Sequence, residues 1–179
     1  KYNSQIFVID NLSNAHIKEF NNLRKSTNIN FFECDLSIQN ETNSIFENIY
    51  NKYNAPVTVW HLAANSNIPA GIINPNIDLK DTFKTTFCLV EACKKYDIQN
   101  FVFASSSAIY GNFNNFLIKE STGPLRPISN YGAMKLASEA ICFAAAEKYL
   151  KNLRIFRFPN VVGLPPTHGV IYDFINKLK

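Results

Sequence analysis

The chain has 179 residues, of which 46% are hydrophobic, and this suits one domain with a substantial core. The net charge is only +4 and the basic residues are scattered, so we expect no nucleic-acid-binding surface. Four cysteines without a C-x-x-C pair, three histidines and no apolar run of membrane-spanning length predict a cytoplasmic protein with reduced cysteines, no metal site and no membrane contact.

Short apolar runs alternate with longer amphipathic stretches, which is typical of a parallel sheet covered by helices. Strands are expected at 5–10, 30–34, 57–62, 100–105 and 153–158, and helices near 14–25, 40–53, 75–97, 129–150 and 169–179. Prolines punctuate the two longest loops, as expected where ligand-binding segments leave the carboxyl ends of strands. The predicted fold class is therefore α/β, with a doubly wound parallel sheet.

The segment Tyr131-Gly132-Ala133-Met134-Lys135 predicts a proton-transfer site. On a helix, residues i and i+4 share a face, so the Lys135 ammonium is expected to lie near the Tyr131 phenol. A phenol titrates near ~10, and a cation close by favours the phenolate, which is the form that acts as a general base. A serine from Ser105–Ser107, at the end of an expected strand, could hold a substrate hydroxyl. This is alcohol-to-ketone chemistry, although the same tyrosine–lysine spacing also occurs on solvated helices.

Two longer segments, Phe103–Gly111 (FASSSAIYG) and Ser129–Lys135 (SNYGAMK), resemble the extended short-chain dehydrogenase/reductases. Within this group they are most similar to the NAD-dependent nucleotide-sugar epimerases typified by UDP-glucose 4-epimerase. The resemblance implies a Rossmann-like NAD-binding domain over residues 1–163 and the start of a substrate-binding region over residues 164–179.

The family's glycine-rich phosphate loop is not found, because all six glycines lie at or beyond Gly71. The same resemblance therefore predicts a sheet without its first strand and a chain without the rest of the substrate lobe. We expect such a chain to be inactive by itself.

The resemblance implies that NAD contacts lie at the strand ends. Asp10 and Asn11 follow the first apolar run, where a carboxylate can accept hydrogen bonds from the adenosine ribose and disfavours a 2′-phosphate, so NAD is expected rather than NADP. Asp10 could equally cap the next helix. Asp35 and Leu36 match the position that meets adenine, with a plain turn as the competing interpretation. The other residues implied to contact the cofactor are Leu62, Ala63, Ala64, Ser105, Tyr131, Lys135 and Phe158.

Several family positions carry other residues in this chain. Thr82 stands where the family usually has Asn, Ser66 where UDP-glucose 4-epimerases often have Lys, and Phe158 where many members have Tyr. His61, inside an apolar run, is expected to be a hydrogen-bonded packing residue. His168 is expected to be a solvated loop residue.

The catalytic residues implied by the resemblance are Ser106, Tyr131 and Lys135, and the substrate-binding residues are Ser106, Ser107, Tyr131 and Asn160. Tyr131 would take the proton of a sugar hydroxyl while hydride passes to NAD, and a 4-keto sugar would then receive the hydride on its other face. Ser107 and Ala108 stand where the 4,6-dehydratases carry Asp-Glu, which disfavours dehydration. One-way oxidation, 4-keto reduction and NAD binding without catalysis remain alternatives.

The expected partners are a nucleotide sugar, with a UDP-sugar favoured, and a second copy of the chain. In the family the helices near 75–97 and 129–150 pair across a dimer. The second helix carries small or apolar residues that would permit close approach, although burial against the sheet could also explain them: Ala137, Ala140, Ile141, Ala144 and Ala145.

Overall fold

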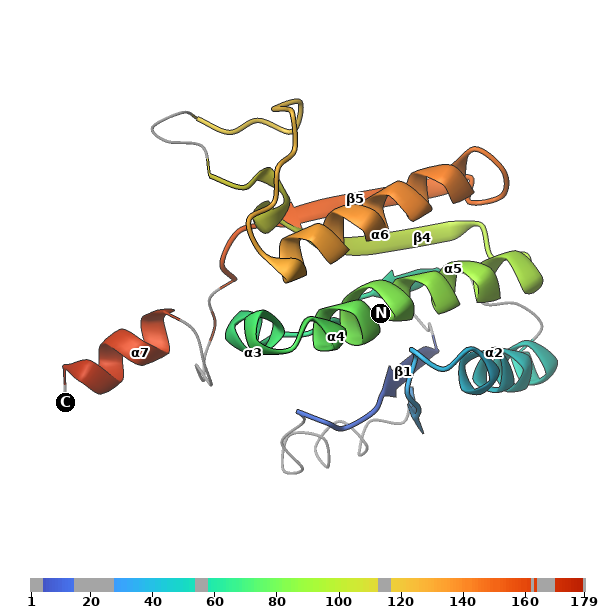
Figure 1. Ribbon diagram of the computed structural model, residues 1–179. Coiled ribbons are helices and arrows are strands. Elements are labelled where there is room, and N and C mark those ends of the chain that lie inside the picture. Colours follow the sequence, from blue (N-terminus) through green and yellow to red (C-terminus); the bar gives the residue numbers. More distant parts are fainter. Residues whose placement is uncertain are drawn as a thin grey trace.

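The computed structural model describes residues 5–14, 28–53, 58–112, 117–161, 163 and 170–178. Within these ranges the strands form two parallel sheets (Figure 1). One pairs β1 (Ile6–Asp10) with β2 (Ile29–Glu33), and the other has the order β3 (Val59–His61), β4 (Asn100–Ser106), β5 (Asn152–Phe158). The predicted α/β class and parallel pairing are confirmed, and all five expected strands are found close to their predicted positions.

Three helices agree with prediction, namely α2 (Gln39–Tyr53), α6 (Asn130–Ala146) and α7 (Val170–Lys177), and α5 (Thr85–Lys95) covers the second half of a longer predicted helix. The helix expected at 14–25 falls almost wholly outside the described residues. The helix expected at 75–97 is divided into α4 (Pro75–Asp78), a π-helical segment η1 (Leu79–Lys84) and α5. Two short elements were not predicted, the helix α3 (Ile68–Ile73) and the 3₁₀ helix η2 (Ser107–Tyr110).

The hydrophobic core lies between β4 and the helices α5 and α6 (Figure 1). Phe101 and Phe103 of β4 are fully buried, and they join Leu89 and Cys93 of α5 and Cys142 of α6 in one cluster. The near-continuous burial of β4 is what a strand covered on both faces requires. β5 alternates between exposed and half-buried residues, as an edge strand does.

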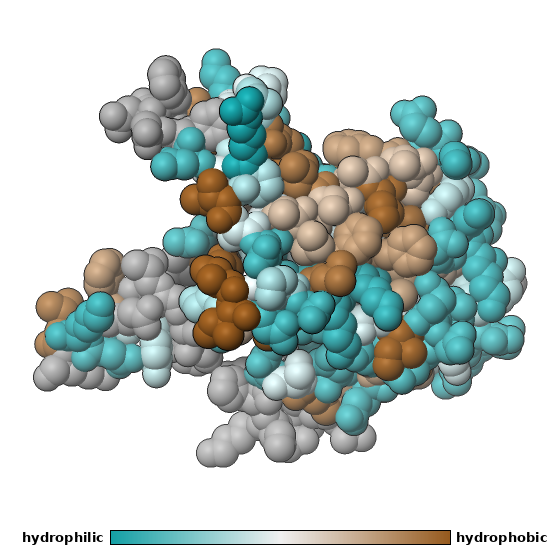
Figure 2. All heavy atoms as spheres, viewed as in Figure 1, coloured by the Kyte–Doolittle hydropathy of each residue, from teal (hydrophilic) through white to brown (hydrophobic). Residues whose placement is uncertain are grey.

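One side of α6 faces outward. Figure 2 shows brown and pale-brown atoms gathered over this helix, where Ala140, Phe143 and Ala144 are exposed. Of the apolar residues singled out in the sequence, Ala145 is buried in the core, while Ala137 and Ile141 are half-buried. Within the described ranges, no helix combines the length and hydrophobicity needed to cross a bilayer.

Candidate active site

The residues predicted to be catalytic lie where β4 runs into η2 and where α6 begins. The Ser106 hydroxyl caps η2 by accepting a hydrogen bond from the Ala108 N–H at 3.1 Å. Ser129 caps α6 in the same way, accepting from the Gly132 N–H at 3.0 Å. A Cβ on Gly132 would lie 2.6 Å from the Ala108 carbonyl oxygen, so the glycine lets the first turn of α6 approach η2 closely.

This close approach brings Tyr131 to Ser106, as the sequence predicted. Burial raises the pKa of Tyr131, a hydrogen bond with Ser106 acts in the opposite direction, and the charge of Asp78 raises the pKa further. The expectation that Lys135 would lower the pKa of Tyr131 is wrong for this structure, in which the phenol is favoured over the phenolate.

Lys135 lies deep in the site, with only 2% of its surface exposed. Its Nζ donates a hydrogen bond to the Ala104 carbonyl at 2.7 Å and lies 4.8 Å from the centre of the Phe103 ring and 5.8 Å from that of Tyr131. Burial lowers the pKa of Lys135 to about 8. The ammonium is thus held beside the tyrosine at a substantial desolvation cost.

A buried ion pair that the sequence analysis did not predict lies behind these residues. Glu139 of α6 is 1% exposed and pairs with Arg157 of β5, with 2.8 Å between Oε2 and Nη2. Ser105 donates its hydroxyl proton to Glu139 Oε1 at 2.5 Å, so this hydroxyl cannot also donate a hydrogen bond to the cofactor. Arg157 Nη1 also donates to the Tyr110 hydroxyl and to the Glu120 carbonyl, at 3.0 and 2.8 Å, which ties η2 and the following loop to the sheet.

The residues expected at the adenosine end of the cofactor lie at the carboxyl ends of β1 and β2. Asn11 and Asp35 line one hollow there together with Glu33, Cys34 and Glu41. Asp10 is exposed and accepts a hydrogen bond from the Leu12 N–H at 2.7 Å, so it stabilises a local turn and remains accessible. These oxygen acceptors fit the hydroxyls of a ribose.

Asp35 is already engaged by its neighbours. Its carboxylate accepts from the backbone and hydroxyl of Ser37 and forms a 2.8 Å ion pair with Lys80. Burial alone would raise its pKa, but the bonds from Lys80 and Ser37 prevail and hold the pKa below its ordinary value. Leu36, also expected to contact the cofactor, is buried in the core.

The remaining expected contacts follow β3 and β5. Leu62 is 67% exposed directly after β3, and the small side chains of Ala63 and Ala64 leave room beside the backbone. Phe158 is 42% exposed and stacks on Phe156, while Asn160 is exposed beyond the strand. The predicted residues therefore gather at the carboxyl ends of the strands, and small, hydroxyl-bearing and acidic side chains there fit a dinucleotide.

His61 is buried and neutral, which confirms that it is a packing residue. Its Nε2 lies 2.8 Å from the Thr86 hydroxyl, which itself donates to the Thr82 carbonyl, so Nε2 carries the proton. Burial, with a smaller contribution from Lys135, lowers the pKa of His61 to about 3. Thr82 uses its hydroxyl to accept from the Asn65 N–H, Ser66 is exposed, and His168 lies outside the described residues.

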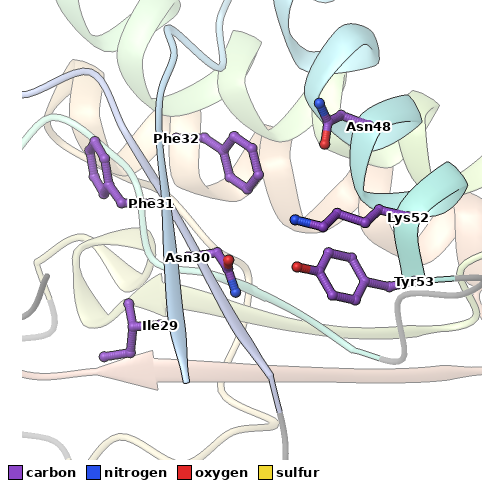
Figure 3. A pocket seen from close by; sticks show the side chains of 7 residues that line it. All are labelled: Ile29, Asn30, Phe31, Phe32, Asn48, Lys52 and Tyr53. Atoms are coloured by element: carbon purple, nitrogen blue, oxygen red, sulfur yellow. The ribbon is translucent and has the colours of Figure 1, made fainter. Parts of the chain in front are cut away.

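A separate hollow lies between β2 and α2, where the side chains of Lys52 and Tyr53 point toward the strand (Figure 3). It is lined by Ile29, Asn30, Phe31, Phe32, Asn48, Lys52 and Tyr53. None of these residues was assigned to the cofactor or to catalysis. This hollow is therefore distinct from the site at the strand ends.

Comparison with known proteins gives a family for the whole chain. Residues 1–179 match the NAD dependent epimerase/dehydratase family. The UDP-glucose 4-epimerase of Bacillus subtilis is 31% identical over 76% of the chain and 39% of its own length.

Solved structures similar to this chain include 4-epimerases as well. The UDP-N-acetylglucosamine 4-epimerase of Methanobrevibacter ruminantium, in complex with UDP-N-acetylmuramic acid, is 28% identical with a TM-score of 0.81, over 97% of this chain and 55% of that one. The Thermus thermophilus UDP-glucose 4-epimerase, in complex with NAD, is 28% identical with a TM-score of 0.78, over 91% and 50% of the two chains. The chain spans 39% to 55% of the length of three curated relatives that it matches.

Proposed function

The chain belongs to the NAD-dependent epimerase/dehydratase family, and from this membership we propose that it carries the NAD-binding and catalytic part of a nucleotide-sugar 4-epimerase. NAD is the cofactor of this family. The observation that carries the proposal is the meeting of Ser106, Tyr131 and Lys135 where β4 ends and α6 begins. A protein that only bound NAD would not require this trio.

In the proposed reaction the Tyr131 oxygen takes the proton of the sugar 4-hydroxyl. Ser106 holds the sugar 4-oxygen by a hydrogen bond. Bound NAD would supply the hydride chemistry at C4 of the sugar, so that the 4-keto sugar could receive the hydride on its opposite face. Tyr131 then returns the proton, so the net change is an isomerisation. Lys135 is fixed on the Ala104 carbonyl with its Nζ 5.8 Å from the centre of the Tyr131 ring, so a positive charge is near the tyrosine during proton transfer, although it does not lower the pKa of the resting phenol.

We assign substrate recognition to solvent-exposed residues near these three side chains. Ser107 directly follows Ser106, Asn160 follows Phe158, which pairs with Ser106 in the sheet, and both are exposed, so we propose that both contact the substrate. Ser107 and Ala108 cannot supply the acid and base that eliminating water from C5 and C6 requires, so epimerisation is favoured over dehydration. The UDP-sugars named for the similar proteins make a UDP-sugar the proposed substrate.

The experiment uses the natural protein in its full length, incubated with NAD and either UDP-glucose or UDP-galactose without added reductant. We expect NMR spectra to show interconversion of the two sugars. Tyr131→Phe should lower the rate at least about 100-fold because the general base is lost, and Tyr50→Phe, on the exposed surface of α2, should leave it unchanged.

If a UDP-sugar is converted in only one direction with net formation of NADH, the reaction is a simple oxidation and not an epimerisation. An unchanged rate in Tyr131→Phe would overturn the catalytic assignment. NAD binding without turnover of any UDP-sugar would favour a non-catalytic NAD-binding protein.

A further inference from the structure

Asp78, the last residue of α4, is a completely buried acid close to the active site. Its Oδ1 accepts a hydrogen bond from Asn65 Nδ2 at 2.7 Å. Its Oδ2 is buried and has no hydrogen-bond partner among the described residues. A buried carboxylate with one free oxygen is costly, so its presence calls for a role.

The carboxylate holds the turn that follows β3 through Asn65. The Asn65 side chain donates to the Asn67 carbonyl at 2.9 Å and accepts from the Asn67 N–H at 2.8 Å. The backbone N–H of Asn65 donates to the Thr82 hydroxyl at 3.2 Å. With the whole side-chain amide of Asn65 engaged, its contact with Asp78 fixes the turn relative to α4 and η1.

The other side of the carboxylate meets α3. A Cβ on Gly71 would lie 1.8 Å from Asp78 Oδ2, so only glycine leaves room for the acid. The Gly71 carbonyl accepts a hydrogen bond from Asn130 Nδ2 at 2.9 Å, and Asn130 directly precedes Tyr131 on α6. A continuous set of contacts thus leads from Asp78 through α3 to the proton-transfer tyrosine.

Asp78 also contributes charge. Burial is the main cause of the raised pKa of Tyr131, the hydrogen bond from Ser106 lowers this pKa, and the negative charge of Asp78 raises it. The same charge also raises the pKa of Asp81. The Lys135 Nζ lies 5.8 Å from the centre of the Tyr131 ring. A negative charge beside a phenol makes the phenolate a stronger base once it has formed.

We propose that Asp78 is a positioning residue of the active site, which holds residues 65–71 against the first turn of α6 and keeps a buried negative charge beside Tyr131. The proposal rests on the proposed function, since it gives that charge a role in proton transfer. It assigns Asn65 and Gly71 to the same unit.

The test compares Asp78→Asn with Asp81→Asn in the natural full-length protein. Asp81 lies one turn further along and is only half-buried, so it offers the same chemical change away from Asn65 and Gly71. Tyrosine ring carbons labelled with ¹³C are titrated by NMR, and the Tyr131 signal is identified by its loss in Tyr131→Phe. We expect Asp78→Asn to lower the pKa of Tyr131 by roughly one pH unit, and Asp81→Asn to change it much less. The acid limb of the kcat/KM profile should move by the same amount.

A Tyr131 titration that is the same in Asp78→Asn and the wild type would overturn the proposal. If Asp78→Asn does not fold, Asn65→Ala tests the contact instead, because it removes the hydrogen bond and keeps the charge. That variant should lower kcat roughly tenfold with an unshifted pH profile, and an unchanged kcat would also overturn the proposal. The titration needs no turnover. If the pKa of Tyr131 shifts in Asp78→Asn but the wild type is inactive, the proposed function is refuted and the role of Asp78 is not.

Discussion

Burial of the charged Lys135 side chain destabilises the folded protein, but it places an ammonium group beside Tyr131. Its side chain is almost inaccessible, and burial lowers its pKa from 10.5 to about 8, which means that the folded protein disfavours the charged form. The hydrogen bond to Ala104 and the ring of Phe103 recover only part of the lost hydration. Under the proposed function, this cost is explained by the place of the Lys135 ammonium beside Tyr131.

We therefore predict that Lys135→Met abolishes turnover and yet stabilises the protein without NAD by about 1 to 3 kcal/mol at pH 7, since methionine needs no hydration. Between pH 8 and 10.5 the unfolded chain binds more protons at this lysine than the folded chain does, so the stability of the wild type rises with pH in that window. The advantage of the variant should accordingly shrink there. Urea unfolding at several pH values measures both effects.

The exposed Lys148, near the end of α6, is the control, and Lys148→Met should change stability little at any pH. A Lys135→Met protein that is less stable than the wild type at pH 7 would mean that its hydrogen bond and ring contacts outweigh the desolvation of the ammonium.

The geometry of the site depends on how closely α6 approaches η2. The two are in contact at Gly132, where the space for a side chain is occupied by the Ala108 carbonyl. Ser106 and Tyr131 stand on opposite sides of this contact. Any separation of the two elements would therefore lengthen the distance between the Ser106 and Tyr131 hydroxyls.

Gly132→Ala should destabilise the protein by about 1 to 3 kcal/mol and lower kcat at least tenfold, because the methyl group must push α6 away from backbone atoms that cannot move aside. Thermal unfolding and initial rates measure the two losses. The matched control is Gly123→Ala, since a Cβ at Gly123 meets no atom within 4 Å. Equal effects of the two substitutions would show that the close contact does not position Tyr131.

The sequence predicted those elements whose hydrophobic residues recur at regular spacing within the element itself. The apolar run ending at Ala104 predicted β4, and the spacing of Tyr131 and Lys135 predicted a shared helix face. The short helix α3 carries no period to detect, although the side-chain cap of Asn67 and the early Pro69 were usable signals. The contact between Asp78 and Asn65 could not be predicted, because it arises only when distant segments fold together.

At the scale of the whole molecule, α5 and α6 pack against each other and leave an apolar outer surface. Phe87 of α5 is 43% exposed and Phe143 of α6 is 53% exposed, and the small Ala140 and Ala144, within one turn of Phe143 on α6, are also exposed. Small residues beside a protruding aromatic ring allow another helix pair to approach closely. The expected homodimer would be formed at this surface by a two-fold pairing of the helices.

Phe143→Arg should convert this dimer to monomers, because two-fold symmetry places two new guanidinium groups, one from each copy, in the apolar surface without a partner carboxylate. Size-exclusion chromatography with light scattering on the natural full-length protein measures the mass directly. Ser44→Arg, which adds the same cation on the exposed side of α2, should leave the mass unchanged. A wild-type protein that is monomeric at micromolar concentration would contradict the pairing, whereas a Phe143→Arg protein that remains dimeric would place the interface elsewhere on the molecule.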